Sequence, residues 1–508
     1  MGNSWRFPLE PMDESNRSLL SNVRPGEWKN PEPAPVYNLV VVGAGTAGLV
    51  SAIGAAGLGA KVALVERHMM GGDCLNVGCV PSKSLIRPAR LAHEMKHAAR
   101  LGLTGAETRP EDFHKIQERL RKIRASISPH DSARRFTEAG VDVFFGEARF
   151  DGPDSVEVEG KRLRFIKAVI ATGARAVHPD IVGLAEVGFV TNETVFNLTK
   201  LPGSLMVIGG GPIGCELAQA FHRLGSRVVI VSRGAFLPRE DQDASELLGK
   251  VFRREGMEVR INAEPLRVTS KNGRKMVTIL TESGEETLEC DEILIGAGRK
   301  PNTEGLNLEA AGVTYDPLKG VAVDDHLRTA NPNIFAAGDI CMAHKFTHAA
   351  DAAARIVLKN ALFMGRARLS SQNMPWCTYT EPEIAHVGMY EHEARKHGIK
   401  TSVYKVEMSG NDRAIVDGED EGFVKVLVKN GSDKILGATI VAAHAGEMIS
   451  EISVAMSAGM GLGGLANVIH PYPTQAEAIK RVADAYNKTR LTPFLKKAFG
   501  WWLSWSRR

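Results

Sequence analysis

Two copies of a strand, turn and helix pattern restrict the fold of this chain more than any other feature of its sequence. In the first copy, the apolar run Tyr37–Val42 is typical of a buried parallel strand. The turn that follows holds three glycines, Gly43, Gly45 and Gly48. A second strand is expected at Lys61–Val65, followed by Glu66, whose carboxylate can hold ribose hydroxyls. Together these features predict a dinucleotide site whose pyrophosphate lies at a helix N-terminus, and we prefer this interpretation to an accidental run of glycines.

The second copy predicts a second bound dinucleotide. A strand at Ser204–Ile208 leads into another glycine-rich turn, and the helix after it is expected from Glu216 to Leu224. The glycines of this turn are Gly209, Gly211 and Gly214.

The strand that closes the second copy ends without an acidic residue. Ser232 and Arg233 stand there, with Arg239 nearby. Serine and arginine can bind a 2′-phosphate that a carboxylate would repel, so the pattern favours NADPH over NADH. The alternative is that both arginines are only solvated.

Two cysteines, Cys74 and Cys79, stand between the two copies and are followed closely by Lys83. Thiols at this separation can close a disulfide across a short loop, and a neighbouring cation or helix N-terminus can hold one of them as a thiolate. The alternatives are two buried cysteines that act as small apolar residues, or half of a metal site. No second pair of cysteines or histidines completes a zinc site, so we predict a redox-active pair and no metal.

Composition limits the class of protein. A chain of 508 residues predicts roughly three domains. The net charge of +4 does not indicate nucleic-acid binding, and six cysteines are too few for a disulfide-stapled secreted scaffold. The first residues lack a signal-peptide pattern, and no stretch approaches the roughly 18 apolar residues of a membrane span. We therefore expect a cytoplasmic protein.

Three stretches lie outside these patterns. Residues 1–36 are polar and proline-rich and are expected to wander or to lie on the surface, although Trp5 and Trp28 suggest docking. The stretch Phe113–Phe136 is expected to form a helix whose many basic side chains are solvated. Beyond Asn373, alternating apolar residues predict an antiparallel sheet.

Several further motifs occur in the order that characterises one enzyme family. They are Ala171-Thr172-Gly173, Gly298-Arg299 and Ala337-Gly338-Asp339. With the cysteine pair and the two glycine-rich turns, they make the chain resemble the pyridine nucleotide-disulfide oxidoreductases from Tyr37 to Asn487. Dihydrolipoamide dehydrogenase, glutathione reductase and mercuric reductase belong to this group.

The resemblance implies an α/β fold with two Rossmann-like dinucleotide-binding domains, the second inserted in the first, and a C-terminal α+β dimerisation domain. The FAD domain would comprise residues 37–175 and 303–372, and the NAD(P)H domain residues 176–302. Residues 373–490 would form the dimerisation domain of a homodimer with one FAD per subunit, followed by a basic tail at 491–508.

The resemblance also implies roles for individual residues. In the family, hydride passes from NAD(P)H to FAD, and the electron pair then enters the disulfide. Cys79 would be the thiolate next to the flavin, Cys74 the thiol that meets the substrate, and Lys83 would pair with Glu216 near the flavin. The cofactor contacts that the resemblance implies elsewhere are Glu66 at the adenosine ribose, Asp339 at the ribityl chain, and Gly72, Lys83, Ala148, Thr172, Gly173, Gly298 and Ala349.

The chain departs from the family near its C-terminus. Relatives that reduce lipoamide or glutathione carry a catalytic histidine and proline, with a glutamate five residues after the histidine. Aligning Pro473 and Glu477 with that pattern puts Tyr472 in the catalytic place; a two-residue slip would restore His470 but leave Glu477 out of register. A phenol titrates near 10, so Tyr472 cannot readily serve as a base at neutral pH.

Other departures concern the relationship to mercuric reductase. Tyr472 and the run Arg239-Glu240-Asp241 look like that enzyme, yet no cysteine follows Cys377, whereas mercuric reductases end in a cysteine pair. Pro212 stands where several relatives have a tyrosine that gates the nicotinamide pocket.

We therefore predict an FAD-dependent enzyme that passes hydride from NADPH, with NADH as the alternative reductant, through FAD to the Cys74–Cys79 disulfide and on to a small thiol, disulfide or soft-metal acceptor. The alternatives are a dihydrolipoamide dehydrogenase, a mercuric reductase without the C-terminal cysteine pair, and a non-enzymatic flavin redox sensor. The basic, tryptophan-rich stretch Phe494–Arg508 is expected either to lie on a membrane surface or to cover the partner subunit.

Overall fold

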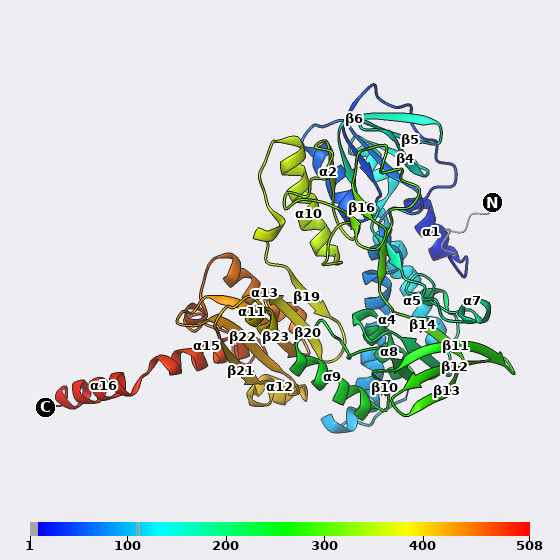
Figure 1. The fold of residues 1–508 in the computed structure, drawn as a ribbon. Coiled ribbons are helices and arrows are strands. Elements are labelled where there is room, and N and C mark those ends of the chain that lie inside the picture. The colour runs from blue at the N-terminus through cyan, green and yellow to red at the C-terminus, as the bar shows by residue number, and fades with distance from the viewer. Residues whose placement is uncertain (1–8, 108, 110–111, 508) are drawn as a thin grey trace. The chain divides into compact units, whose positions relative to one another are not determined.

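The computed structural model describes residues 9–107, 109 and 112–507 (Figure 1). The chain divides into two units. The first comprises the residues up to Ala98 together with Thr104–Phe236 and Gly256–Ser371. The second comprises Ala99–Leu103, Leu237–Glu255 and the chain from Gln372 onward.

A parallel sheet with the strand order β3-β2-β1-β6-β18 forms the centre of the first unit. The strands are β1 (Tyr37–Val42), β2 (Val62–Glu66), β3 (Val141–Phe145), β6 (Lys161–Ile170) and β18 (Ile334–Ala336). Nearly every side chain of β1 and β2 is buried, as expected for a parallel sheet that is covered on both faces. Helices α2 (Thr46–Gly57) and α10 (Thr347–Leu362) pack against each other, and both contact β6.

Strand β6 belongs to two sheets because it is ten residues long. Its second half pairs parallel with β1, from Phe165 to Ile170. Its first half pairs antiparallel with β5 (Ser155–Val158), which pairs in turn with β4 (Ala148–Gly152).

The second glycine-rich turn lies in a smaller parallel sheet with the order β10-β9-β8-β14. Its strands are β8 (Ser204–Ile208), β9 (Arg227–Val231), β10 (Glu258–Arg260) and β14 (Glu292–Ile295). Helix α8 (Pro212–Arg223) follows β8. An antiparallel meander shares its apolar core with this sheet and consists of β11 (Glu264–Lys271), β12 (Arg274–Thr281) and β13 (Gly284–Cys290).

Two short antiparallel strands, β7 (Ala174–Ala176) and β15 (Arg299–Pro301), mark where the chain leaves the first sheet and returns to it. The second dinucleotide fold is therefore inserted in the first, as predicted. The shorter elements of this unit are α6 (Ala133–Glu138), α7 (Leu184–Val187), β16 (Tyr315–Asp316) and β17 (Gly320–Val321).

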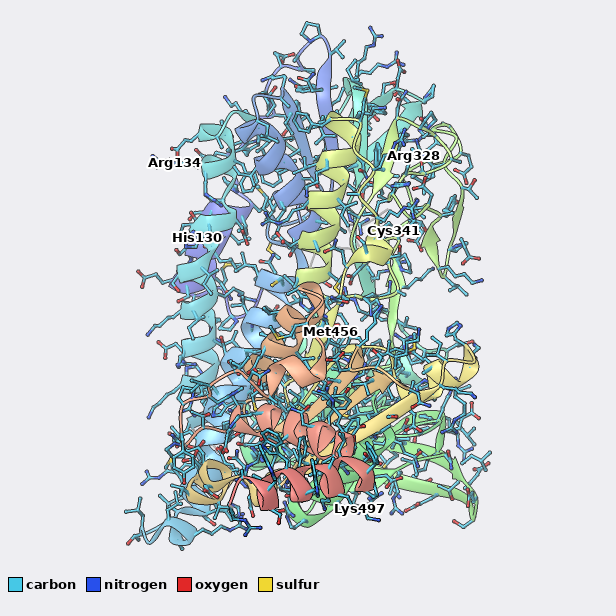
Figure 2. The ribbon with its side chains drawn as sticks, turned by 90° about the vertical axis from the view of Figure 1, so that its left-hand side faces the viewer. His130, Arg134, Arg328, Cys341, Met456 and Lys497 are labelled. Atoms are coloured by element: carbon cyan, nitrogen blue, oxygen red, sulfur yellow. The ribbon has the colours of Figure 1, made fainter. Side chains whose placement is uncertain are left out.

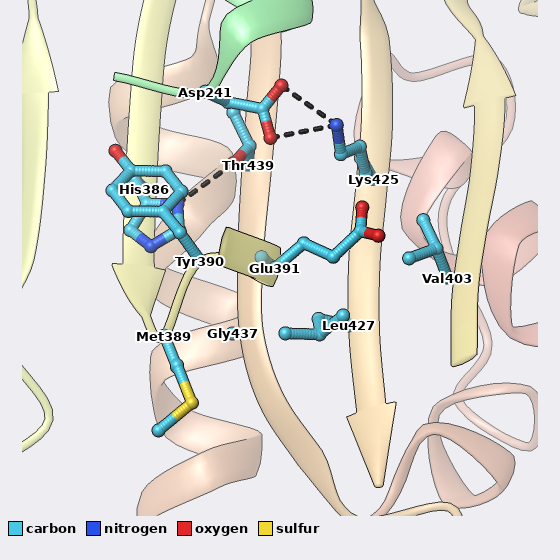
Figure 3. Close-up of a pocket in the computed structure, with 11 residues that line it drawn as sticks. Asp241, His386, Met389, Tyr390, Glu391, Val403, Lys425, Leu427, Gly437 and Thr439 are labelled. Carbon is cyan, nitrogen blue, oxygen red and sulfur yellow. Dashed lines mark hydrogen bonds and ion pairs between the residues drawn. The ribbon is translucent and has the colours of Figure 1, made fainter. Parts of the chain in front are cut away.

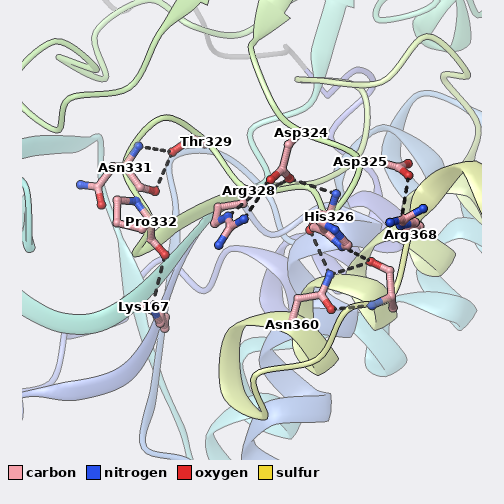
Figure 4. A network of polar contacts seen from close by, with 11 residues as sticks. Lys167, Asp324, Asp325, His326, Arg328, Thr329, Asn331, Pro332, Asn360 and Arg368 are labelled. Carbon is pink, nitrogen blue, oxygen red and sulfur yellow. Dashed lines mark hydrogen bonds and ion pairs between the residues drawn. The ribbon is translucent and has the colours of Figure 1, made fainter.

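A polar network fastens the loop before β18 to the end of α10 (Figure 4). The Asp324 carboxylate accepts hydrogen bonds from the backbone N–H groups of His326 and Arg328, both at 2.9 Å. The ring of His326 lies 3.0 Å from the carbonyl oxygen of Ala367, and Asn360 donates to the His326 carbonyl, also at 3.0 Å. These contacts hold the returning chain where β18 can pair with β6.

The N-terminal leader docks on the first unit through helix α1 (Glu14–Val23). Leu19 and Val23, one helical turn apart, are fully buried. Trp28 donates from Nε1 to a backbone carbonyl of β3 at 3.1 Å. The described part of the leader therefore does not wander, because its apolar face has a place to pack; Trp5 lies outside the described residues.

The basic stretch expected to be a solvated helix is buried along one side, so the prediction is wrong for Arg121 and Arg124, whereas Lys115, Arg119 and Lys122 are exposed as expected. Helix α5 (Asp112–Ile127) ends before Pro129 and short of Phe136. Arg121 and Arg124 are 2% and 1% exposed, because α1 packs against the face of α5 that carries them. The leader supplies the polar partners that make this burial tolerable.

The second unit is built on the antiparallel sheet that the alternating apolar residues predict. Its order is β19-β20-β23-β22-β21. The strands are β19 (Pro375–Thr378), β20 (Glu383–Gly388), β21 (Thr401–Glu407), β22 (Phe423–Lys429) and β23 (Ile435–Ala442). The helices around it are α11 (Glu391–Lys396), α12 (Asp412–Asp417), α13 (Ala445–Ser457), α14 (Leu462–Leu465) and α15 (Glu477–Arg490).

Helix α9 (Gln242–Glu255) belongs to this second unit, and the two acids before it attach it to the sheet. Glu240 accepts hydrogen bonds from the Tyr390 hydroxyl at 2.9 Å and from Trp376 Nε1 at 3.1 Å. Asp241 forms an ion pair with Lys425 at 2.8 Å beside a shallow pocket (Figure 3). The acidic run noted in the sequence is therefore an anchor within this unit.

Helix α16 (Pro493–Trp505) follows α15 and extends away from the sheet of its own unit (Figure 1). Among the helices that the structure describes, none is both long and apolar enough to cross a membrane.

Candidate active site

The two cysteines of the predicted redox pair lie on consecutive helices. Cys74 is in the short helix α3 (Gly72–Asn76), and Cys79 is the first residue of α4 (Cys79–Lys96). Gly78 joins the helices where a Cβ atom would come within 2.7 Å of a backbone oxygen of α3, so a larger residue would force the turn apart. The sharp connection brings the thiols within hydrogen-bonding distance of each other.

The two thiols differ in acidity. A hydrogen bond from Cys74, aided by the Thr347 hydroxyl and the positive charge of Lys83, lowers the pKa of Cys79 to about 6. The thiol of Cys79 lies 3.4 Å from Thr347 Oγ1, at the start of α10. The pKa of Cys74 is raised, because its proton is held by Cys79 and because it is half-buried. This asymmetry makes Cys79 the thiolate of the pair.

Lys83 and Glu216 meet beside this pair. The Lys83 ammonium lies 2.7 Å from a carboxylate oxygen of Glu216, although the two residues are 133 positions apart in sequence. Lys83 is on α4, one turn after Cys79, and Glu216 is on α8. The pair therefore joins the cysteine helix to α8, the helix that follows the second glycine-rich turn.

Arg299 forms a second, partly buried ionic cluster near the cysteines. Its guanidinium pairs with Asp73, which precedes Cys74, and lies 3.2 Å from Asp339. The same guanidinium donates to the carbonyl oxygen of Ala174 at 2.6 Å. Burial raises the pKa of Asp339, an effect that the nearby Arg299 charge opposes. Asp339, expected at the ribityl chain, thus lies close to the residue before Cys74.

The residues around the first glycine-rich turn fit an FAD molecule. A Cβ on Gly48 would overlap the carbonyl oxygen of Gly43, and one on Gly72 would come within 2.6 Å of Gly45, so the backbone segments touch without side chains between them. Glu66 is 8% exposed and accepts two backbone hydrogen bonds at 2.7 Å, which leaves oxygen lone pairs for ribose hydroxyls. Such a cradle at the start of α2 suits a pyrophosphate.

The remaining residues expected at FAD are spread over the first unit. Thr172 donates from its hydroxyl to the carbonyl of Asn302 at 2.9 Å, which ties the turn at Gly173 to the end of β15. Ala148 begins β4, and Ala349 is buried in α10. Gly298 directly precedes β15.

The second glycine-rich turn has the same close approach. A Cβ on Gly214 would overlap the carbonyl oxygen of Gly209, and Pro212 is the first residue of α8, where its missing N–H costs no hydrogen bond. Gly211 caps this helix. These features fit the pyrophosphate of a second dinucleotide.

The residues expected to select NADPH lie in different surroundings. Ser232 is buried and follows β9 directly. Arg233 is 61% exposed and pairs with Glu264 at 3.2 Å. Arg239 is exposed and belongs to the second unit.

The structure reveals a support for the cysteine loop that the sequence did not indicate. Arg124 on α5 donates to the Asn76 carbonyl at 2.8 Å and to the Asn16 side chain at 2.6 Å. Asn76 lies between the two cysteines, and Asn16 is on the leader helix α1. A neighbouring pair joins Arg121 to Asp13 at 2.5 Å. In the sequence, only the spacing of the buried residues along α5 could have suggested this contact. The many charged residues of the same helix make that spacing hard to recognise.

In the second unit, His470 and Tyr472 have opposite surroundings. The His470 side chain is 5% exposed, and its two ring nitrogens face the Glu451 carboxylate at 2.9 Å and the Val468 carbonyl at 3.1 Å. Tyr472 is 69% exposed and donates its single hydroxyl proton to Asp412 at 2.8 Å, a bond that raises its pKa. The ring of His470 is therefore occupied, whereas the Tyr472 side chain is open to solvent.

Glu477 also differs from the pattern of a histidine-orienting acid. It begins α15 and forms an ion pair with Arg481 one turn later, at 3.5 Å. No group of three or more acidic, histidine or cysteine side chains is placed to hold a metal ion in the part of the chain that the structure describes.

Comparison with known proteins agrees with this geometry. The family described as pyridine nucleotide-disulphide oxidoreductase matches residues 37–355, and its dimerisation domain matches residues 374–483. The chain belongs to the pyridine nucleotide-disulfide oxidoreductases. It is accordingly an FAD-dependent oxidoreductase that works with NAD(P)H, and it carries the dimerisation domain of the family.

Curated relatives carry two activity names. A mercuric reductase from Streptomyces lividans is 34% identical over 456 residues, covering 89% of this chain and 96% of the relative. A dihydrolipoyl dehydrogenase from Thermus scotoductus is 34% identical over 467 residues, covering 89% of this chain and 98% of the relative. The solved HOCl-induced flavoprotein disulfide reductase of Escherichia coli is 30% identical with a TM-score of 0.78, covering 88% of this chain and 99% of that one.

Proposed function

We propose that this enzyme uses NADPH to reduce a Cys74–Cys79 disulfide and passes the electrons to a small thiol, disulfide or soft-metal acceptor whose reduction needs no histidine base. The observation that carries the proposal is the coupled pair of thiols, in which Cys79 has a pKa of about 6 and the pKa of Cys74 is raised. A low-pKa thiolate beside a protonated partner is typical of a working redox pair.

The reaction is a two-electron exchange. NADPH and one proton supply the two electrons and two protons that convert the disulfide into two thiols. Bound FAD supplies the chemistry that accepts hydride from NADPH and delivers the electron pair to sulfur. Cys74 then donates to the acceptor, and the disulfide forms again as the acceptor is reduced.

The surrounding residues favour this exchange through their charges. The hydrogen bond from Cys74 contributes most to the low pKa of Cys79, the charge of Lys83 adds to it, and Glu216 keeps the Lys83 ammonium in place at 2.7 Å. Asp73 and Arg299 hold the helix that carries Cys74. A pair of this kind, with one partner largely buried, is a weak source of stability, so we assign Lys83 and Glu216 the task of tuning the site.

The choice of NADPH rests on Ser232 and Arg233. The ion pair of Arg233 with Glu264 is exposed on both sides, and such surface pairs contribute about 0–1 kcal/mol. Arg233 can therefore exchange Glu264 for a 2′-phosphate, which it can bind through two parallel hydrogen bonds.

A second candidate function is dihydrolipoamide dehydrogenase. The relative from Thermus scotoductus favours it, but Tyr472 and the occupied ring of His470 speak against it. The variant Tyr472→His should raise turnover with lipoamide at neutral pH, because an imidazole can exchange a proton with Cys74 where a phenol cannot. An unchanged turnover would contradict the alignment that puts Tyr472 in the position of the family's catalytic histidine.

Mercuric reductase is a special case of the same proposal, in which the soft-metal acceptor is Hg(II). The relative from Streptomyces lividans favours it. The enzyme names of the relatives speak against the redox-sensor alternative.

An acceptor screen tests the function. Purified enzyme is given NADPH or NADH with lipoamide, small disulfides, thiol-complexed Hg(II), Cu(II) and quinones, and oxidation of the nicotinamide is followed. We expect turnover with at least one disulfide or soft metal, its loss in Cys74→Ser, and a higher kcat/KM for NADPH that falls in Arg233→Ala. Turnover that survives Cys74→Ser would overturn the thiol route, and a higher kcat/KM for NADH would overturn the choice of nucleotide.

We further propose that the enzyme is a homodimer, that it works in the cytoplasm, and that residues 494–508 contact a membrane surface. The dimerisation domain supports the first point, and the six cysteines of this 508-residue chain support the second. The tryptophans and basic residues of the tail support the third.

A further inference from the structure

Helix α16 (Pro493–Trp505) is exposed on every side. No residue of this helix is buried, and its large apolar side chains are 38–78% exposed. Seven of them lie within 12 residues: Phe494, Leu495, Phe499, Trp501, Trp502, Leu503 and Trp505. Three of the six tryptophans of the chain are therefore gathered on one helix that nothing in its own unit covers.

The side chains of α16 divide cleanly between two faces. At about 3.6 residues per turn, Phe494, Trp501 and Trp505 follow one another along one face. The positions of Leu495, Phe499 and Trp502 adjoin it and widen the apolar face. The opposite face consists of Lys496, Lys497, Gly500 and Ser504. Figure 2 labels Lys497 on this helix.

The charge of the protein is concentrated at the same end. From Ala485 onward the sequence has no acidic residue and contains six basic ones, which are Lys488, Arg490, Lys496, Lys497, Arg507 and Arg508. The chain as a whole has a net charge of only +4, so the part before this stretch is slightly acidic. The positive surplus of the protein therefore belongs to the tail.

We infer that α16 binds an anionic lipid surface, lying in the plane of the interface with its tryptophans inserted and its lysines beside the headgroups. An aromatic apolar face opposite a basic polar face is the pattern of interfacial helices, and each cation near an anionic surface strengthens binding by about fivefold. The match to the family's dimerisation domain ends at residue 483, before the tail, which argues against a second copy of the chain as the occupant. This inference rests on the proposed membrane contact and names its lipid chemistry; it is independent of the redox reaction.

The test uses the full-length enzyme and vesicles of phosphatidylcholine with or without phosphatidylserine. Co-sedimentation is measured for the wild type, for a variant that lacks residues 491–508, and for Lys496→Gln with Lys497→Gln. We expect binding to the anionic vesicles that weakens with salt, is lost on truncation, and falls about 25-fold in the double variant. Lys396→Gln with Lys400→Gln removes two exposed lysines elsewhere in the same unit and should bind as the wild type does.

Reductase activity and light-scattering mass are recorded on the same samples. Equal binding to both kinds of vesicle would overturn the lipid chemistry while leaving a membrane contact, and no binding to either would overturn both. Dissociation of a dimer on truncation would overturn the inference in favour of a second copy of the chain. Loss of reductase activity with every acceptor would contradict the proposed function without affecting the vesicle result.

Discussion

Cys79 is the residue at which the chemistry of the site can be measured most directly. Its pKa of about 6 predicts that alkylation of the reduced enzyme by iodoacetamide is half-maximal near pH 6 at Cys79. Cys74→Ala should move this midpoint upward, because it removes the hydrogen bond that contributes most to the shift. Mass spectrometry of the modified peptides across a pH series gives both values.

The same experiment contains its control. Burial raises the pKa of Cys290 to about 11, so that residue should stay unmodified in the same range of pH. A lower midpoint at Cys74 than at Cys79 would reverse the assignment of the two thiols.

A double-mutant cycle can separate the effects of Lys83 and Glu216 on the pKa of Cys79 and on stability. Lys83→Met should raise the alkylation midpoint of Cys79 and lower the free energy of unfolding by about 1–3 kcal/mol, less than for a fully buried pair because Lys83 is 35% exposed. Adding Glu216→Gln should partly reverse the change in the alkylation midpoint and the loss of stability. The Glu216 carboxylate that Lys83→Met leaves unpaired raises the pKa of Cys79, and the second substitution removes that carboxylate. The measurements are alkylation rates and denaturant unfolding, and additive effects of the two substitutions would show that the pair is not coupled.

At the scale of elements, the leader helix α1 supports the redox loop through Arg124. Asn16→Ala should lower the free energy of unfolding by about 1–3 kcal/mol, because it leaves one side of a buried guanidinium without its hydrogen bond. We also expect the pH profile of Cys79 alkylation to broaden or shift, since Arg124 holds the carbonyl of Asn76 between the two cysteines. Denaturant unfolding and the alkylation series measure the two effects.

A matched control lies on the same helix. Ser21 is exposed and bonds only within α1, so Ser21→Ala should change stability by no more than about 0.5 kcal/mol. If Asn16→Ala behaved like Ser21→Ala in both measurements, the leader would have no part in the site.

The leader and α5 also show why the exposure of a helix cannot be predicted from its own residues alone. A helix rich in basic residues usually has a solvated face, yet α5 buries Arg121 and Arg124 because α1 brings Asp13 and Asn16 to them. The partners are more than 100 positions away, so the spacing of residues along α5 could suggest a buried face but not which groups it meets.

At the scale of the whole molecule, the dimerisation domain predicts that folding and association are linked. The enzyme should have twice the mass of the chain in light scattering, and its melting temperature should rise with protein concentration, because association stabilises only the folded subunit. A variant that lacks residues 491–508 should keep the dimeric mass and the concentration-dependent melting temperature. A monomeric mass with a concentration-independent melting temperature would contradict the homodimer.

The sequence by itself predicted the two dinucleotide folds and the close approach of Cys74 and Cys79, and the family resemblance added the insertion of one fold in the other. Strand, glycine turn and helix are local patterns, and a Cβ at Gly48 or Gly214 would overlap backbone, so the chain can make these turns in only one way. Cys74 and Cys79 are close enough in sequence for their meeting to be predicted from spacing alone.

The family resemblance implied the Lys83–Glu216 pair, but only the tertiary structure decided which other groups surround the cysteines. Lys83 meets Glu216 across 133 positions, and Arg124 joins the leader to the cysteine loop. The difference between His470 and Tyr472 likewise depends on Glu451 and Asp412, which reach them from other helices. Charges and hydrogen bonds act over a few ångströms of space, whereas patterns in sequence report only neighbours along the chain, and this is why the electrostatics of the site needed the fold.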